Sequence, residues 1–165
     1  MSDIAALFQQ LTLGVYVIGV ANAGRCSGFT AAWVMQVSFD PLLLAVSINP
    51  GHASYALLHS SGSFTVNVLK RGQLELARAF GTQSARDQDK LAGTRWWPGR
   101  HGAPILEEAS AYFDCELSDS LPSGDHELVV GRVIEGRILS PGAVPMTYTE
   151  TGDMDGSSVL YPENF

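Results

Sequence analysis

The fold is decided by the segment Cys26-Ser27-Gly28-Phe29-Thr30-Ala31-Ala32-Trp33-Val34-Met35-Gln36-Val37-Ser38-Phe39-Asp40-Pro41, where hydroxyl, amide and aromatic side chains gather between two apolar runs. A strand reads across Gly24 to Trp33, and the next strand is expected to begin only at Leu42. The backbone N–H groups between them then lack strand partners and suit a flat heteroaromatic ring that carries a row of acceptors. A bulged loop whose hydroxyl groups satisfy their own turn explains the same residues. This segment alone leaves both readings open.

Short apolar runs separated by turn residues continue on both sides of this segment. Helical spacing predicts helices at 3–11, 53–60 and 73–80, with one or two further helical turns at 84–91. Strands are expected at 13–21, 25–34, 42–48, 63–69, 111–119 and 127–139, and a loop that carries Trp96 and Trp97 is expected at 95–104. Strands joined by short turns, with few helices between them, predict a mainly β fold, a closed antiparallel barrel with a few helices.

Composition indicates one small domain without a nucleic-acid partner. The chain has 165 residues and 45% apolar content, which suits a core that buries about two thirds of the unfolded surface. It carries 17 Asp and Glu against 10 Lys and Arg, for a formal net charge of −7. Nucleic-acid binding needs a basic face, and Lys70-Arg71 is the largest basic cluster in the sequence.

Cysteine usage and the first apolar run bear on location. Cys26 and Cys115 lie far apart in separate predicted strands, which fits a reducing cytosol better than a disulfide scaffold. The run from Leu11 to Ala21 is similar to the apolar part of a secretory signal, but no basic residue precedes it. It is also too short to span a bilayer. We therefore expect a cytoplasmic protein with no membrane partner.

The sequence lacks the common motifs of metal and nucleotide sites. The four histidines are scattered without metal-ligand spacing. Neither a GxSxG nucleophile turn nor a GxGxxG dinucleotide loop is present. These observations favour a cofactor held by a barrel surface, with no metal. We expect a cofactor-binding domain at 1–140 and a tail at 141–165 that packs on the barrel or on a partner subunit.

Several motifs occur in a recognisable order. The opening segment ends in Val37-Ser38-Phe39-Asp40-Pro41, and after it come an apolar strand at 42–48, Phe64-Thr65-Val66-Asn67-Val68-Leu69, a helix at 73–80 and Gly124-Asp125-His126. In this order, over about residues 5–140, they resemble the flavin reductase-like family. The resemblance implies an FMN-binding split barrel, similar to flavoredoxin and to the reductase components of two-component flavin monooxygenases.

The resemblance also implies an activity. It predicts an NAD(P)H-dependent flavin reductase with FMN as cofactor, FAD as the alternative flavin, and NADH or NADPH as the hydride donor. It further implies a homodimer and a flavin-dependent monooxygenase as a candidate partner. Two other functions stay open: a flavoredoxin-like electron carrier without a nicotinamide site, and a split-barrel binding module without catalysis. Gly124-Asp125-His126 favours the reductase over the carrier, and the small-residue turn speaks against the binding module.

The resemblance assigns site residues. His126 is expected beside the nicotinamide as the catalytic residue. The segment from Ser47 to Ser54 contains no Lys or Arg, where some relatives have a basic residue, so the flavin phosphate is expected to rest on N–H groups at a helix start that Ser54 caps. The residues expected to bind the cofactor are Thr30, Ala31, Ala32, Trp33, Gln36, Val37, Ser38, Ser47, Asn49, His52, Ser54 and Phe80.

Two of these residues have a second reading from the sequence alone. His126 also fits a strand-opening residue that is bonded to Asp125. Trp33 fits a core aromatic as well as a side chain that flanks a bound ring.

Overall fold

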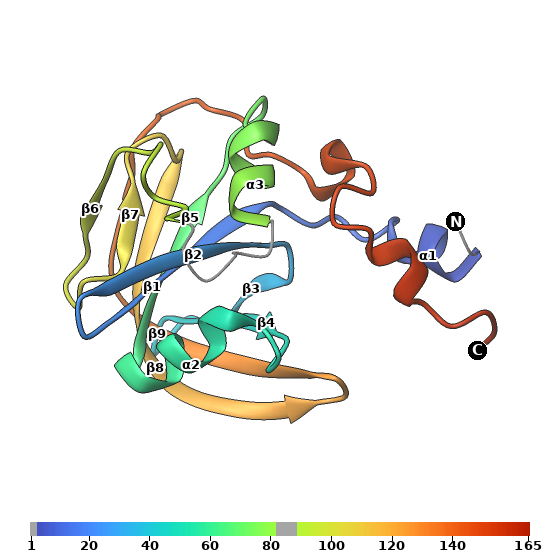
Figure 1. The fold of residues 1–165 in the computed structure, drawn as a ribbon, viewed down its shortest axis with the longest axis horizontal. Helices are drawn as coiled ribbons and strands as arrows, with labels where there is room; N and C mark the ends of the chain where they lie inside the picture. The colour runs from blue at the N-terminus through green and yellow to red at the C-terminus, as the bar shows by residue number, and fades with distance from the viewer. Residues whose placement is uncertain (1–2, 82–88) are drawn as a thin grey trace.

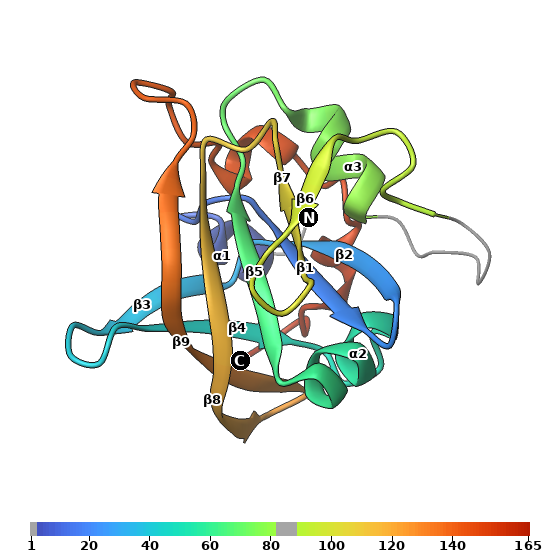
Figure 2. The same ribbon diagram turned by 90° about the vertical axis from the view of Figure 1, so that its left-hand side faces the viewer.

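Seven antiparallel strands form a single curled sheet in the computed structural model, which describes residues 3–81 and 89–165. The strand order is β2-β1-β5-β8-β9-β4-β3, and Figure 2 shows the sheet wrapping around an interior. The strands are β1 (Tyr16–Asn22), β2 (Arg25–Ala31), β3 (Val34–Ser38), β4 (Leu43–Ile48), β5 (Ser63–Val68), β8 (Ala111–Ser123) and β9 (His126–Ile138). The predicted split antiparallel barrel is confirmed.

The split lies between the two outer strands of this sheet. β2 and β3 follow one another in the chain through Ala32 and Trp33, yet they are at opposite ends of the strand order. Each therefore pairs along one side only, β2 with β1 and β3 with β4. The chain crosses the opening of the barrel at Ala32 and Trp33.

A few short helices lie outside the sheet (Figure 1). They are α1 (Asp3–Phe8), α2 (Ala53–Ser61), α3 (Leu74–Gly81) and the 3-10 turns η1 (Tyr148–Thr151) and η2 (Ser157–Leu160). α2 ends at Gly62, whose φ of 65° lets its N–H bond to Leu58 O. Within the described ranges, no helix combines the length and the apolar character needed to cross a membrane.

Both faces of β1 are buried, which gives the molecule two clusters of apolar side chains. Side chains alternate between the faces of a strand, so Ile18 and Val20 point to one cluster and Val17 to the other. The first cluster fills the barrel and consists of Ile18, Val20, Phe29, Leu44, Val46, Ile48, Leu58, Phe64, Val66, Cys115 and Val129. The second consists of Val15, Val17, Leu69, Ala77, Phe80, Leu91, Leu106, Ala109 and Met146.

Two predictions around the opening segment are wrong. The strand expected at 25–34 ends at Ala31, and residues 34–38 form β3, which pairs with β4 through contacts such as Met35 with Ala45. The N–H groups of this stretch are therefore not all free of strand partners. The sequence signal was weak because β3 is an edge strand with exposed residues on its surface.

The loop expected at 95–104 is also wrong. It contains β6 (Trp96–Pro98), which pairs with β7 (Pro104–Leu106). Leu106 is buried in the second cluster and Trp96 packs against it, so tertiary packing overrides a segment rich in Gly and Pro. Among the other boundaries, the first helix stops at Phe8 and β8 runs on to Ser123. Most of the helical turns expected at 84–91 lie outside the described residues.

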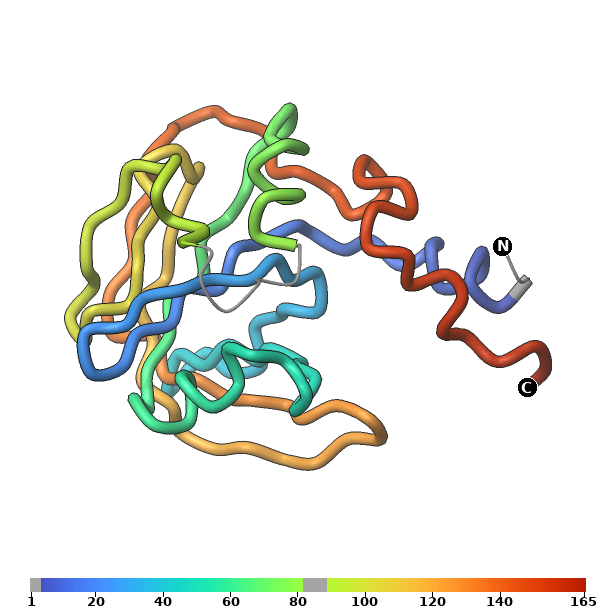
Figure 3. The backbone as a smooth tube through the Cα atoms, viewed as in Figure 1, coloured from blue at the N-terminus to red at the C-terminus, as the bar shows by residue number. Residues whose placement is uncertain are grey.

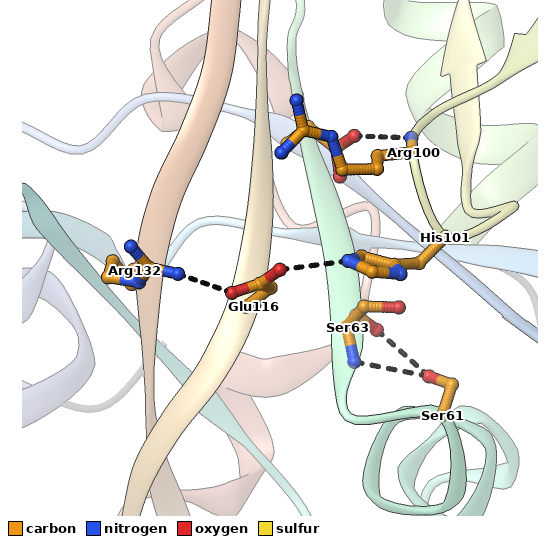
Figure 4. A network of polar contacts seen from close by, with 7 residues as sticks. Ser61, Ser63, Arg100, His101, Glu116 and Arg132 are labelled. Atoms are coloured by element: carbon orange, nitrogen blue, oxygen red, sulfur yellow. Dashed lines mark hydrogen bonds and ion pairs between the residues drawn. The ribbon is translucent and has the colours of Figure 1, made fainter.

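Polar contacts fix the turn between β6 and β7 to the outer face of the barrel (Figure 4). The Arg100 N–H donates to Asp114 Oδ2 at 2.7 Å. His101 Nε2 lies 2.9 Å from Glu116 Oε1, and Arg132 Nη2 donates to the other oxygen of Glu116 at 2.6 Å. The hydrogen bonds from His101 and Arg132 hold the pKa of the Glu116 carboxyl below its usual range.

The two ends of the chain lie side by side next to the barrel (Figures 1 and 3). Met146 is buried in the second cluster, and Thr147 makes an isolated bridge with Gly14. Farther along, the rings of Phe8 and Tyr161 have centroids 5.4 Å apart. We call α1 together with residues 147–161 the terminal arm. The predicted domain boundary at residue 140 stays a prediction.

Candidate functional site

A cavity of about 490 Å³ lies between the split of the barrel and the terminal arm. Its size is within the range of about 300–1,000 Å³ that is usual for sites of small molecules and cofactors. The barrel side of its wall includes Phe29, Thr30, Ala31, Ala32, Trp33, Ser47, Ile48, Asn49, His52, Gly81 and His126. The arm side includes Phe8, Tyr148, Met154, Asp153, Asp155 and Tyr161.

Eight of the residues predicted for the site line this cavity: Thr30, Ala31, Ala32, Trp33, Ser47, Asn49, His52 and His126. They come from β2, from Ala32 and Trp33, which we call the split connection, from β4 and the residue after it, from the start of α2 and from the start of β9. Residues from distant parts of the sequence therefore meet at one end of the barrel.

Five predicted cofactor-binding residues do not line the cavity: Gln36, Val37, Ser38, Ser54 and Phe80. The first three belong to β3, where Gln36 Nε2 donates to Ser38 O at 3.3 Å. Phe80 is buried in the second cluster. Ser54 is buried and is not the cap of α2, because His52 holds that position.

The split connection offers backbone donors. Its carbonyls are engaged, since Val34 N–H donates to Ala32 O at 3.1 Å and Ser47 N–H donates to Trp33 O at 3.0 Å. The N–H groups of Ala32 and Trp33 have no acceptor among the described residues. The sequence predicted N–H groups without strand partners along the opening segment, and in the structure Ala32 and Trp33 are the residues that provide them. They give the cavity two donors for a ligand that carries acceptors.

Thr30 has a structural partner. Its Oγ1 donates to Ala77 O at 2.7 Å and so ties β2 to α3. The hydroxyl hydrogen is used in this bond, which leaves only acceptor capacity for a ligand.

His52 is part of the cavity wall. Its ring lies 4.7 Å from that of Phe29, and its Nδ1 accepts a hydrogen bond from Ser54 N–H at 3.2 Å. Burial, with a smaller contribution from the charge of Lys90, lowers the pKa of His52. The ring is then neutral near pH 7, and because Nδ1 accepts, its Nε2 carries the proton.

His126 marks another part of the wall. Its Nδ1 lies 2.7 Å from Asp125 Oδ1, and its ring centroid lies 4.8 Å from that of Trp33. The hydrogen bond from His126 holds the pKa of Asp125 below its usual range. An ionised carboxylate only accepts, so Nδ1 is the donor and Nε2 is left for a ligand. The bond to Asp125, which was the alternative reading of His126 from the sequence, coexists with a place for His126 on the cavity wall.

The residue after His126 anchors β9 to α2. Glu127 Oε2 accepts from the Tyr55 hydroxyl at 2.5 Å, and Glu127 Oε1 lies 2.8 Å from His59 Nε2. The hydrogen bond from Tyr55 lowers the pKa of the Glu127 carboxyl. α2 begins next to His52 and β9 begins at His126, so this contact helps to fix the positions of His52 and His126 relative to each other.

The donor set fits a flat heteroaromatic ring with acceptors along one edge. Two unpartnered N–H groups, small side chains at Ala31 and Ala32, and the aromatic face of Trp33 lie on one wall. Among residues 3–81 and 89–165, no group of three His, Cys, Asp or Glu side chains is arranged to hold a metal ion. The chemistry of this wall is that of a site for an organic cofactor.

The sequence prediction missed several cavity residues, including Phe29, Ile48, Gly81, Tyr148 and Met154. Phe29 could have been predicted, because it directly precedes Thr30 in the segment that indicated the site. Tyr148 belongs to the tail at 141–165, for which only packing on the barrel or on a partner subunit was predicted. No local sequence pattern connects residues 147–161 to a cavity that is lined by residues 29–33. Tertiary packing of the terminal arm brings the two segments together.

Comparison with known proteins identifies close relatives of this chain. It is 35% identical to the FMN reductase (NADH) RutF of Pseudomonas syringae over 138 residues, which are 84% of this chain and 76% of the relative. The NADH:FAD oxidoreductase SgcE6 of Streptomyces globisporus superposes with a TM-score of 0.81 at 27% identity, over 87% of this chain and 86% of the other. Nitrilotriacetate monooxygenase component B from Mycobacterium thermoresistibile superposes with a TM-score of 0.77 at 30% identity, over 84% and 75%.

Some relatives are much longer, since the chain spans between 24% and 40% of the length of the first three curated relatives that it matches. The family model described as "Flavin reductase like domain" matches residues 8–156, nearly the whole chain. This chain belongs to the flavin reductase-like family.

Proposed function

We propose that the chain is an NAD(P)H-dependent flavin reductase that binds FMN, or FAD, in the cavity at the split of the barrel. One observation carries the proposal: the unpartnered N–H groups of Ala32 and Trp33 lie in the same wall as the ring pair of Trp33 and His126. The first feature suits the acceptor edge of a flavin, and the second presents a polar ring nitrogen beside an aromatic face.

The residues of the wall have distinct roles in this proposal. Ala32 and Trp33 donate backbone hydrogen bonds to the ring, and the absent side-chain bulk at Ala31 and Ala32 lets the ring approach the backbone. A bound flavin supplies the N5 atom that accepts hydride from the nicotinamide. His126, fixed by Asp125 and Trp33, orients the nicotinamide through Nε2. Correct placement of two rings accounts for much of the acceleration in such a reaction.

The names of the relatives support NADH as donor and a monooxygenase as a partner. One relative is named as an NADH-dependent FMN reductase and one structural neighbour as an NADH:FAD oxidoreductase. Another neighbour is a component of a monooxygenase. We propose that reduced flavin leaves this chain for a flavin-dependent monooxygenase.

We also propose that two copies of the chain form a homodimer. The support is an apolar stripe on the edge strand β3 and its flanks, where Trp33, Met35, Val37 and Phe39 are exposed by 48%, 62%, 41% and 86%. A contiguous apolar surface on an edge strand favours burial against another chain. Both cysteines are free thiols, which supports the expected cytoplasmic location.

The test is NADH consumption by the purified chain in air at increasing FMN concentration. The proposal expects a rate that depends on both the chain and FMN and that saturates with each substrate. NADH consumption no faster than that of free FMN, under conditions where the chain binds FMN, would leave the electron-carrier function in its place.

A further inference from the structure

The cavity residue His126 lies one residue beyond the last point at which β9 pairs with the rest of the barrel. β4 ends at Ile48, which pairs with Glu127. Among the described residues, His126 has a strand partner only in Ser123, which belongs to the same β8–β9 hairpin. Figure 1 shows the end of this hairpin projecting from the barrel. The place of His126 relative to the barrel therefore depends on how firmly Glu127 is held.

The hydrogen bond between His126 and Asp125 does not supply this anchor. Asp125 lies in the turn of the hairpin, and its side chain is 90% exposed. Its bond sets the rotation of the imidazole, but it moves together with the hairpin. The ring contact with Trp33 is one attachment of His126 to the rest of the barrel. A contact between two rings alone still allows the end of the hairpin to tilt.

Glu127 provides a second attachment, through α2. Glu127 is only 9% exposed, and the alternation of side chains along a strand points it to the side opposite His126. Its Oε2 accepts from the Tyr55 hydroxyl at 2.5 Å, and its Oε1 lies 2.8 Å from His59 Nε2. Tyr55 and His59 are four residues apart on one face of α2, and their ring centroids are 4.4 Å apart. One helix face thus holds both oxygens of the carboxylate.

The helix that holds Glu127 is itself fixed to the barrel. Leu58 of α2 is fully buried in the first cluster, and Ser54 is buried as well. The hydrogen bond from Tyr55 lowers the pKa of the Glu127 carboxyl, so the group is ionised at neutral pH and only accepts hydrogen bonds. The contact of Glu127 with α2 therefore links the end of the hairpin to a rigid part of the molecule.

We infer that Glu127, held by Tyr55 and His59, is a positioning residue for hydride transfer, because it fixes the start of β9 and so keeps His126 against Trp33. The inference rests on the proposed function, in which His126 orients the nicotinamide. A misplacement of about 1 Å that arises far from the reacting atoms can slow a reaction by about a hundredfold. A small tilt of the hairpin end is therefore enough to reduce the rate.

Two conservative variants test this role. Tyr55→Phe removes one hydroxyl and leaves the carboxylate in place, and Glu127→Gln keeps an acceptor for Tyr55 but removes the negative charge. Tyr112→Phe is the matched control, because the Tyr112 hydroxyl donates to Glu135 Oε1 at 2.6 Å. This bond also joins a tyrosine to a glutamate of β9, but neither residue lines the cavity or contacts α2.

Stopped-flow absorbance measures the reduction of the FMN-loaded chain by NADH, and fluorescence titration measures the dissociation constant of FMN. In Tyr55→Phe and Glu127→Gln we expect the limiting reduction rate to fall at least about fivefold. The dissociation constant of FMN in both variants, and both quantities in Tyr112→Phe, should stay within about twofold of the wild type. In a His126→Ala background, Tyr55→Phe should change the rate by less than about twofold, because the contact acts through His126.

A measurement on the flavin-free chain reports the position of His126 without any reaction. The chain has four histidines, so the proton signals of the His126 imidazole are identified by their loss in His126→Ala. Their chemical shifts depend on the ring current of Trp33, whose ring centroid lies 4.8 Å away. These signals should move in Tyr55→Phe and stay in place in Tyr112→Phe.

Unchanged reduction rates in Tyr55→Phe and Glu127→Gln would overturn the positioning role and leave the proposed reductase intact. The same follows if Tyr55→Phe slows the His126→Ala background as much as the wild type, or if the His126 signals do not move in Tyr55→Phe. An FMN-loaded wild type that stays oxidised with both NADH and NADPH would instead overturn the proposed function, and this inference with it.

Discussion

The imidazole of His126 lies against the indole of Trp33, with ring centroids 4.8 Å apart and ring planes inclined by 51°. Trp33 belongs to the connection that crosses the split, and His126 is the first residue of β9. The contact therefore joins two walls of the cavity and holds a ring nitrogen beside an aromatic face. The bond between His126 and Asp125 fixes the imidazole from its other side.

Replacement of His126 should affect reduction more than flavin binding. In His126→Ala the nicotinamide loses its orienting group, and we expect the rate of flavin reduction to fall about tenfold to a hundredfold. The dissociation constant of FMN should stay within about twofold, because the backbone donors of Ala32 and Trp33 remain. Stopped-flow reduction and fluorescence titration measure the two quantities. His101→Ala removes a histidine of the outer face as a control, and a wild-type reduction rate in His126→Ala would refute the assigned role.

The backbone donor at Ala32 is open to a direct test. Ala32→Pro removes this N–H, whereas Ala32→Gly keeps it. Loss of one hydrogen bond should weaken FMN binding by about tenfold in the proline variant only. Fluorescence titration measures the affinity, and thermal unfolding establishes that both variants fold. Equal FMN affinities for the two folded variants would mean that the Ala32 N–H does not bind the flavin.

The buried carboxyl of Asp114 on β8 makes the stability of the chain depend on pH. Burial raises the pKa of this carboxyl, although the hydrogen bond from Arg100 N–H opposes the shift. The folded chain then binds the proton more tightly than the unfolded chain does. The stability contributed by the proton is present below the unfolded pKa of about 3.9 and is lost as pH rises through the folded pKa.

Asp114→Asn removes this titration. The free energy of unfolding of Asp114→Asn minus that of the wild type should therefore increase from about pH 4 toward pH 7. Urea unfolding at several pH values measures it, and subtraction of the two curves cancels the other carboxyl groups. A difference that is constant over this range, or that decreases, would exclude the raised pKa as the cause.

The proposed dimer is tested on the apolar stripe of β3. Met35→Glu places a charge in the middle of the stripe and should convert the dimer to a monomer in sedimentation velocity. Ile138→Glu is the matched control, because Ile138 is 68% exposed on β9 and lies outside the stripe. A monomeric wild type, or a dimer that survives Met35→Glu, would show that this surface does not pair two copies.

The sequence allowed the barrel to be predicted where side-chain patterns are local. Buried strands such as β1 and β4 have continuous apolar runs, and their ends were placed within a few residues. β3 and the pair β6 and β7 were missed for a different reason. β3 is a partly exposed edge strand, and β6 owes its form to the packing of Trp96 against the second cluster. Neither feature is visible in a window of the sequence.

The site was predictable to the extent that one continuous segment builds it. Residues 30–33 line the cavity as expected, and His126 joins them through the order of the strands. Gln36 and Ser38 carry polar groups in the same segment, but pairing of β3 with β4 places them away from the cavity wall. Thr30 reaches the wall, yet its hydroxyl hydrogen is taken by Ala77 O. The partners of a hydroxyl or amide depend on contacts between distant segments.

In the proposed function, a reduced nicotinamide passes hydride to a flavin held at the split of the barrel. The most direct measurement is an anaerobic titration of the FMN-loaded chain with NADH, followed by the visible absorbance of the flavin. We expect rapid bleaching of the flavin that is complete at one NADH per bound FMN, and the same result with NADPH if NADH fails. A chain that holds FMN tightly while the flavin stays oxidised with both nucleotides would contradict it.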